Sequence, residues 1–128
     1  MQIEPVSLEG RTIRLEPLER THADGLLKAA DPDIFRLLTG AAKTWDVAGF
    51  EGYIDALLAQ PAFLPFAIVA RESEQAIGTT SYMDIRAAHR GLEIGSTWIG
   101  RAYQGTQINP ECKYLLLRHA FEVLDFVR

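Results

Sequence analysis

The chain has 128 residues, enough for one domain with a hydrophobic core, and its 48% hydrophobic and 23% charged residues are typical of a globular protein. The formal net charge of -4 argues against general binding to nucleic acid, and no apolar run is long enough to span a membrane. The single Cys112 excludes an internal disulfide, and the N-terminus lacks the features of a signal peptide, so we expect a cytoplasmic location.

The first part of the sequence predicts one strand and then helices. Thr12–Leu18 alternates apolar and polar side chains, which indicates a strand. Thr21 is the expected N-cap of the next helix, in a capping box with Asp24. That helix should end near Asp31-Pro32, and Asp33–Leu38 is a candidate for a short turn of helix.

The middle of the sequence predicts another helix and three strands. The helix covers Val47–Gln60, where apolar side chains recur at helical spacing: Phe50, Ile54, Leu57 and Leu58. Extended patterns follow over Phe66–Arg71, Ala76–Ile85 and Leu92–Ile99, separated by short polar turns. Connections this short join antiparallel neighbours, so we expect a meander.

The last predicted helix follows the third of these strands. Asn109 is its expected N-cap, with Pro110 in the first turn and Glu111 placed favourably against the helix dipole. Its expected buried side consists of Leu117, Ala120, Phe121 and Leu124. Phe126–Arg128 is typical of the start of another strand. The element order is that of an α+β fold, and the strand–turn–helix leaves unpaired N–H groups suited to phosphate.

Three segments together resemble the GNAT (GCN5-related N-acetyltransferase) superfamily, in its RimJ/RimL-like ribosomal-protein acetyltransferase branch. They are LEGRTIRLEPLERTHADGL, FAIVARESEQAIGTTSYMDI and EIGSTWIGRAYQGTQINPECKYLLLRHAFE. The resemblance implies a GNAT-like mixed sheet with an N-terminal antiparallel meander and flanking helices. It also implies one domain over residues 1–128, ending after the CoA-binding helix without the last strands of the family.

The resemblance assigns a pyrophosphate loop for acetyl-CoA to the segment before the last helix. The family signature is Gln or Arg, two residues, Gly, one residue, then Gly or Ala. Gln104 matches the first position, whereas Gln107 and Asn109 stand at the two small-residue positions. A Gln in left-handed geometry would cost about 1 kcal/mol. The implied cofactor contacts are Gln104, Gly105, Thr106, Gln107, Ile108 and Asn109.

The resemblance also implies acetyl transfer from acetyl-CoA to a primary amine of a protein N-terminus or a small molecule. In the family, a bulge in the strand before the loop binds the pantetheine and the oxyanion through its backbone, and Trp98 and Ile99 match that segment. Trp98 is equally well explained as a core aromatic. Glu93 matches a catalytic base of some members, with a solvent-facing strand carboxylate as the other interpretation. Ser81 and Tyr82 are candidates for the substrate channel.

The sequence also bears on assembly, on metal binding and on the role of the single cysteine. An open sheet edge favours pairing with a second chain, so this edge is a candidate interface for a homodimer. The alternative function is a catalytically inactive module that assembles through the same edge. The three histidines lack metal-ligand spacing, so no metal is expected. Cys112, in the first turn of a helix, would have a lowered pKa from the dipole, but a role as nucleophile is not expected.

Overall fold

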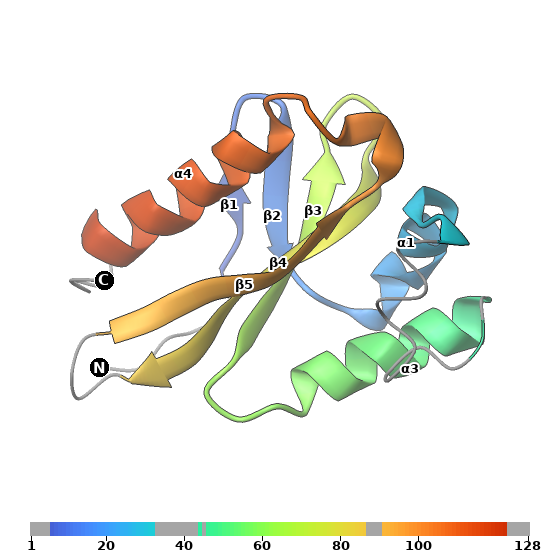
Figure 1. Cartoon of the computed structure of the whole chain (residues 1–128), viewed down its shortest axis with the longest axis horizontal. Coiled ribbons are helices and arrows are strands. Elements are labelled where there is room, and N and C mark those ends of the chain that lie inside the picture. Colours follow the sequence, from blue (N-terminus) through green and yellow to red (C-terminus); the bar gives the residue numbers. More distant parts are fainter. Residues whose placement is uncertain (1–5, 33–43, 45, 87–90, 123–128) are drawn as a thin grey trace.

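The computed structural model describes residues 6–32, 44, 46–86 and 91–122 (Figure 1). Its strands are β1 (Leu8–Glu9), β2 (Ile13–Pro17), β3 (Leu64–Ala70), β4 (Gln75–Arg86) and β5 (Gly91–Ile99). Its helices are α1 (Ala23–Ala29), α3 (Val47–Leu58) and α4 (Ile108–Glu122), with 3-10 turns at Arg20–His22 and Arg101–Tyr103. The predicted α+β class is confirmed.

The strands form one sheet in the order β1-β2-β3-β4-β5, and each neighbouring pair is antiparallel. The predicted meander is therefore confirmed as β3, β4 and β5. β2 pairs with β3, and its alternation has the predicted sense, because Ile13 and Leu15 are fully buried whereas Arg14 and Glu16 are not. The short strand β1 was not predicted.

Helices cover both faces of the sheet (Figure 1). α4 packs on one face, over a cluster of buried side chains from all the longer strands, including Ile13, Leu15, Phe66, Ile68, Ile77 and Ile99. α1 and α3 pack on the other face, over a second cluster that includes Ala67, Val69, Ala76 and Trp98. The connection from β5 to α4 runs past the end of the sheet, from the side of α1 to the side of α4 (Figure 1). The predicted phosphate loop lies in this connection.

The start of the first helix differs from the prediction at Thr21. The residue before the 3-10 turn, Glu19, is extended, and its backbone N–H donates to Nδ1 of His22 at 3.0 Å. Nε2 of the same imidazole lies 3.0 Å from the Glu16 carboxylate. The cap is thus built from Glu19 and His22, while Asp24 pairs with Lys28 at 3.1 Å instead of closing a capping box.

The buried side of α4 was also predicted wrongly. Its buried residues are Ile108, Cys112, Leu115, Leu116 and Ala120. Leu117 and Phe121 are 43% and 48% exposed, so of the predicted buried residues that the structure describes only Ala120 is buried. The helix carries two apolar stripes on opposite sides, and the sheet accepts the one that contains Leu116. In α3, Phe50, Ile54 and Leu57 are buried as predicted, whereas Leu58 is exposed.

Several predictions lie outside the described residues. They concern Asp33–Leu38, Leu124 and Phe126–Arg128. Within the residues that are described, no helix combines the length and the apolar character needed to cross a bilayer.

The two stripes of α4 give a direct test of the fold. Leu116→Ala removes a fully buried side chain and should lower the free energy of unfolding by about 2–5 kcal/mol. Leu117→Ala, the neighbouring leucine on the opposite stripe, should cost about 1 kcal/mol or less. Urea denaturation of both variants measures the difference, and equal destabilisation would contradict the observed packing of α4.

Candidate functional site

The connection from β5 to α4 contains a left-handed turn. β5 ends at Ile99, Arg101–Tyr103 forms a 3-10 turn, and α4 begins at Ile108. Gly105 has a φ of 76°, and a Cβ atom there would meet no other atom within 4 Å. Gln107 is not among the described residues that have positive φ, so the cost of a glutamine in left-handed geometry does not arise at this position. The glycine conformation that the loop needs is supplied two positions earlier.

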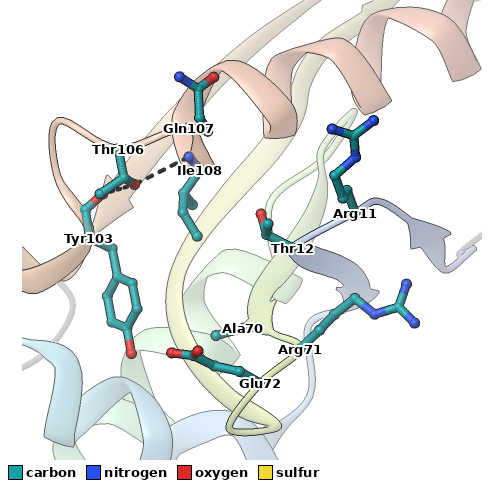
Figure 2. A pocket seen from close by; sticks show the side chains of 9 residues that line it. All are labelled: Arg11, Thr12, Ala70, Arg71, Glu72, Tyr103, Thr106, Gln107 and Ile108. Atoms are coloured by element: carbon teal, nitrogen blue, oxygen red, sulfur yellow. Dashed lines mark hydrogen bonds between the residues drawn. The ribbon is translucent and has the colours of Figure 1, made fainter.

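Side chains of the loop hold its backbone in place. The Gln104 amide donates from Nε2 to the carbonyl of Ile99 at 2.9 Å. The Thr106 hydroxyl donates to the carbonyl of Tyr103 at 2.5 Å and accepts from the N–H of Ile108 at 3.3 Å (Figure 2). The predicted ligand contact Gln104 therefore uses its side chain within the loop itself.

The loop presents a run of backbone donors. The N–H groups of Gly105, Thr106, Gln107 and Asn109 have no hydrogen-bond acceptor among the residues that the structure describes. They lie at the N-terminus of α4, a 15-residue helix whose dipole places partial positive charge there. We name these four N–H groups the amide cradle. Such a group of donors binds phosphate well.

The predicted N-cap of α4 needs a correction. The N–H of Glu111 donates to the carbonyl of Gln107 at 3.0 Å, and this is the first bond of the helix. Gln107 is therefore the N-cap residue, and Asn109 lies inside the first turn. Pro110 occupies the first turn as predicted, where its missing N–H costs no hydrogen bond.

The Glu111 carboxylate fastens the start of α4 to the turn between β1 and β2. It accepts from the N–H of Thr12 at 3.0 Å, from the Thr12 hydroxyl at 2.7 Å and from the N–H of Ile13 at 3.4 Å. A Cβ atom on Gly10 would overlap Oε2 of this carboxylate, so a side chain at this position would displace Glu111 from its contact. Burial acts to raise the pKa of Glu111, but the hydrogen bonds from the turn outweigh it and lower the pKa. The sequence held no signal for this contact.

β5 carries an irregularity before the loop. Thr79 of β4 pairs with Trp98, whereas Ser81 pairs with Gly95, so β5 has one more residue than β4 over this stretch. An extra residue of this kind is a β-bulge, which bends the strand and leaves backbone groups unpaired. A bulge in this segment is what the family resemblance implied.

The Trp98 side chain belongs to the core. It is 8% exposed, and its indole Nε1 donates to the Tyr53 hydroxyl at 3.2 Å. The Tyr53 hydroxyl lies 3.2 Å from the Thr79 hydroxyl, so α3, β4 and β5 share one buried polar network. The core interpretation of the Trp98 side chain is therefore the one that the packing supports. Ile99 packs in the opposite cluster, beneath α4.

The two channel candidates on β4 lie inside the protein. Ser81 is fully buried, and its hydroxyl has no hydrogen-bond partner among the described residues. Tyr82 is fully buried and donates to the carbonyl of Leu116 at 2.5 Å. Burial raises the pKa of Tyr82, so its hydroxyl stays protonated at neutral pH. Tyr82 thereby joins β4 to α4.

Glu93 lies on the exposed side of β5, opposite Met83. Its neighbours Leu92 and Ile94 point to the cluster under α4, as the alternation of the strand requires. Glu93 is six residues from Ile99, which corresponds to about 20 Å along a strand. Only an extended ligand can touch both this carboxylate and the amide cradle.

Two further ionisable side chains near the loop, Arg101 and Cys112, have structural roles. Arg101 pairs with Asp31 at 2.8 Å, and this contact ties the 3-10 turn to the end of α1. Burial and the neighbouring Glu111 raise the pKa of the Cys112 thiol to about 12, the opposite of the predicted direction. Within the described parts of the chain, no three His, Cys, Asp or Glu side chains come together as metal ligands.

Comparison with known proteins agrees with this architecture. The family model described as acetyltransferase (GNAT) domain matches residues 12–128. The chain therefore belongs to the GNAT acetyltransferase family. A search of curated proteins finds no match.

Solved structures of acetyltransferases share the fold of this chain. An acetyltransferase structure from T. thermophilus is 35% identical with a TM-score of 0.85, over 98% of this chain and 65% of that one. A GCN5-related N-acetyltransferase from Brucella melitensis is 30% identical with a TM-score of 0.82, over 97% of this chain and 58% of that one. Mycobacterium smegmatis RimJ, in complex with CoA-disulfide, shares the fold at 20% identity and a TM-score of 0.75, over 95% of this chain and 65% of that one. The chain spans less than two thirds of each of these proteins.

The Glu111 contact predicts a stability difference that depends on pH. Because the pKa of Glu111 is lower in the folded state than its unfolded value near 4.5, the ionised carboxylate stabilises the fold above that pH. Glu111→Gln should therefore cost about 1 kcal/mol at pH 7, measured by urea denaturation. The difference from wild type should shrink as the pH falls through the folded pKa. A difference that is constant from pH 7 to pH 3 would contradict this role of the charge.

Proposed function

We propose that the protein transfers the acetyl group of acetyl-CoA to a primary amine, as a single GNAT-like domain over residues 1–128. The observation that carries this proposal is the amide cradle at Gly105–Asn109. Its four N–H groups, which lack an acceptor among the described residues, lie at a helix N-terminus and match a diphosphate. Membership of the GNAT family and the CoA-disulfide bound to Mycobacterium smegmatis RimJ support acetyl-CoA as the cosubstrate.

The arrangement of β5 and the loop supports a direction for the cosubstrate. With the diphosphate on the amide cradle, the pantetheine arm runs back along β5 toward the bulge before Trp98. The backbone of Trp98 and Ile99 then contacts the pantetheine and the thioester. Backbone N–H groups that are not used in the sheet stabilise the oxyanion of the tetrahedral intermediate.

The chemistry needs a base for the attacking amine. The amine nitrogen forms a bond to the thioester carbonyl carbon, and the carbon–sulfur bond then breaks. The proton leaves the nitrogen for Glu93, directly or through one water molecule, and a proton returns to the CoA thiolate as it departs. Glu93 suits this role because it lies on the exposed side of β5, on the loop-distal side of the bulge.

The proposed acceptor is the amine of a protein N-terminus or of a small molecule, in the cytoplasm. A structure from Vibrio cholerae that shares this fold is described as a ribosomal-protein-serine acetyltransferase, and this description supports a protein amine as the acceptor. Neither a nucleic acid nor a membrane is proposed as partner. The net charge of -4 supports the first of these exclusions.

The alternative function is an inactive module that assembles as a homodimer through the edge of the sheet. β5 pairs only with β4 among the described strands, and an edge of nine residues can accept another strand. The two functions separate in solution, because a strictly monomeric species by light scattering that also turns over acetyl-CoA removes the alternative.

The amide cradle gives a matched test of cosubstrate binding. Isothermal titration should detect binding of acetyl-CoA at millimolar ligand or below. Asn109→Pro deletes one N–H of the cradle in the first helical turn, where proline is tolerated, and should weaken binding about tenfold. Asn109→Ala keeps the N–H and should bind like wild type. No binding by the wild type at millimolar acetyl-CoA would rule out the enzyme function for this chain.

The proposed base predicts a loss of rate without a loss of binding. Glu93→Gln should lower kcat by about 10²-fold or more while the KM for acetyl-CoA changes little. Glu122→Gln, another exposed carboxylate located on α4, is the matched control and should keep full activity. The assay is the release of free thiol from acetyl-CoA with a peptide or small amine as acceptor. Full activity of the Glu93 variant would remove this residue from the mechanism.

A further inference from the structure

Hydroxyl-bearing side chains gather where the bulge of β5 interrupts the ladder with β4. Thr79 pairs with Trp98 at one end of the bulge, and Thr80 follows it. The Thr80 hydroxyl is buried and lies 2.9 Å from the Thr97 hydroxyl, which also donates to the carbonyl of Gly95 at 3.3 Å. A bulge disrupts the backbone hydrogen bonds between two strands. Side-chain hydroxyls therefore hold the strands together at this place.

The side of the bulge that faces α3 carries a directed chain of hydrogen bonds. The indole Nε1 of Trp98 is a donor only, so the Tyr53 hydroxyl oxygen accepts from it, at 3.2 Å. The hydrogen of the Tyr53 hydroxyl is then available to the Thr79 hydroxyl, which lies 3.2 Å away. All three side chains are buried, so the chain is shielded from water and each of its bonds is costly to lose.

Tyr53 reaches this chain of hydrogen bonds from α3, on the face of the sheet opposite α4 (Figure 1). Its ring packs edge-on against Phe50 of the same helix, with the ring centroids 6.5 Å apart. Burial, partly offset by the two hydrogen bonds, raises the pKa of Tyr53, so the hydroxyl keeps its proton at neutral pH. The position of this hydroxyl is therefore set by the packing of α3 in the core.

The residue that Tyr53 holds is one that the proposed reaction uses. The backbone of Trp98 and Ile99 is proposed to contact the thioester and its oxyanion. Groups that stabilise a transition state must be held within about 0.5 Å of the productive geometry. Because the bulge disrupts the ladder bonds that would fix this backbone, the hydrogen bond from the Trp98 indole to Tyr53 is one of the contacts that replace them.

We propose that Tyr53 is a positioning residue for acetyl transfer, an assignment that rests on the proposed function. Its hydroxyl holds the Trp98 indole, and the indole holds the backbone of the bulge where the thioester oxygen needs its donors. Tyr53 itself touches neither acetyl-CoA nor the amine. Helix α3 thereby contributes to the transfer step, although the amide cradle and Glu93 belong to other elements.

The test separates the rate of transfer from the binding of acetyl-CoA. Tyr53→Phe removes one oxygen atom and leaves the indole N–H without its acceptor. In the thiol-release assay, its kcat should fall about tenfold or more, because the donors of the bulge are misplaced. The KM for acetyl-CoA should change little, because the amide cradle is unaffected. A KM that rises while kcat stays at the wild-type value would contradict the assignment.

Ile54→Val is the matched control. It trims a fully buried side chain of the same helix and should also destabilise the fold, as measured by urea denaturation. Because Ile54 makes no hydrogen bond to the bulge, this variant should keep the wild-type kcat. An equal loss of kcat in Ile54→Val would show that any loosening of α3 slows the reaction, and it would overturn the specific role of Tyr53.

A second variant tests whether Tyr53 acts through Trp98. Trp98→Phe breaks the same hydrogen bond from the other side and should lower kcat in the same way. In this background Tyr53→Phe should cause little further loss, because the two residues act as a unit. Full additivity of the two losses would contradict the assignment. Trp98→Phe also provides the measurement of kcat if Tyr53→Phe does not fold, which circular dichroism would show.

A spectroscopic readout does not depend on turnover. In ¹⁵N-labelled protein, Tyr53→Phe should move the Trp98 indole N–H resonance upfield, because this group loses its acceptor. The backbone amides of Thr97, Trp98 and Ile99 should shift with it, whereas Ile54→Val should leave them nearly unchanged. Bulge amides that stay in place in Tyr53→Phe would overturn the assignment.

The remaining outcomes separate this assignment from the proposed function. If the wild type turns over acetyl-CoA and Tyr53→Phe keeps the wild-type kcat, the assignment is wrong while the proposed function stands. If the wild type shows no turnover with any amine acceptor, the proposed function fails, and the assignment fails with it.

Discussion

The position of α4 across the sheet is the constraint on which the rest of the site depends. One stripe of the helix, from Ile108 to Ala120, is buried against the sheet. The Glu111 carboxylate fixes the start of the helix through two backbone N–H groups and the Thr12 hydroxyl. With both its face and its end held, α4 leaves the loop before it little freedom. The donors of the amide cradle are therefore oriented before any ligand arrives, and this reduces the entropy lost on binding.

The direction in which the Glu111 carboxylate points matters for anion binding at the start of α4. A carboxylate at this place would repel a phosphate if it pointed toward the cradle. Glu111 instead turns to the β1–β2 connection, where the N–H groups of Thr12 and Ile13 share its charge. The positive end of the helix dipole thus remains available to a ligand. The same turn carries Arg11 to the rim of the cavity beside the loop.

Local patterns in the sequence were sufficient for the strands β2 to β5 and for the class of fold. β2 was predictable because Ile13 and Leu15 alternate with charged residues, and the meander because its turns are short. The buried side of α4 could not be predicted from such patterns. The helix carries two apolar stripes about half a turn apart, and only contact with the sheet selects which of them is buried. The contact of Glu111 with Thr12 joins residues 99 positions apart, which no local pattern encodes. The family signature could not locate the left-handed residue of the loop, because its first glycine position holds Gln107 here and the positive φ falls on Gly105.

The central claim is that free backbone N–H groups at the start of α4 bind the diphosphate of CoA. Titration of ¹⁵N-labelled protein with CoA, followed by amide chemical shifts, tests it most directly. The amides of Gly105, Thr106, Gln107 and Asn109 should move downfield and show the largest changes in the spectrum, because each gains a charged acceptor. Saturation of the protein by CoA with these four resonances unmoved would contradict the account.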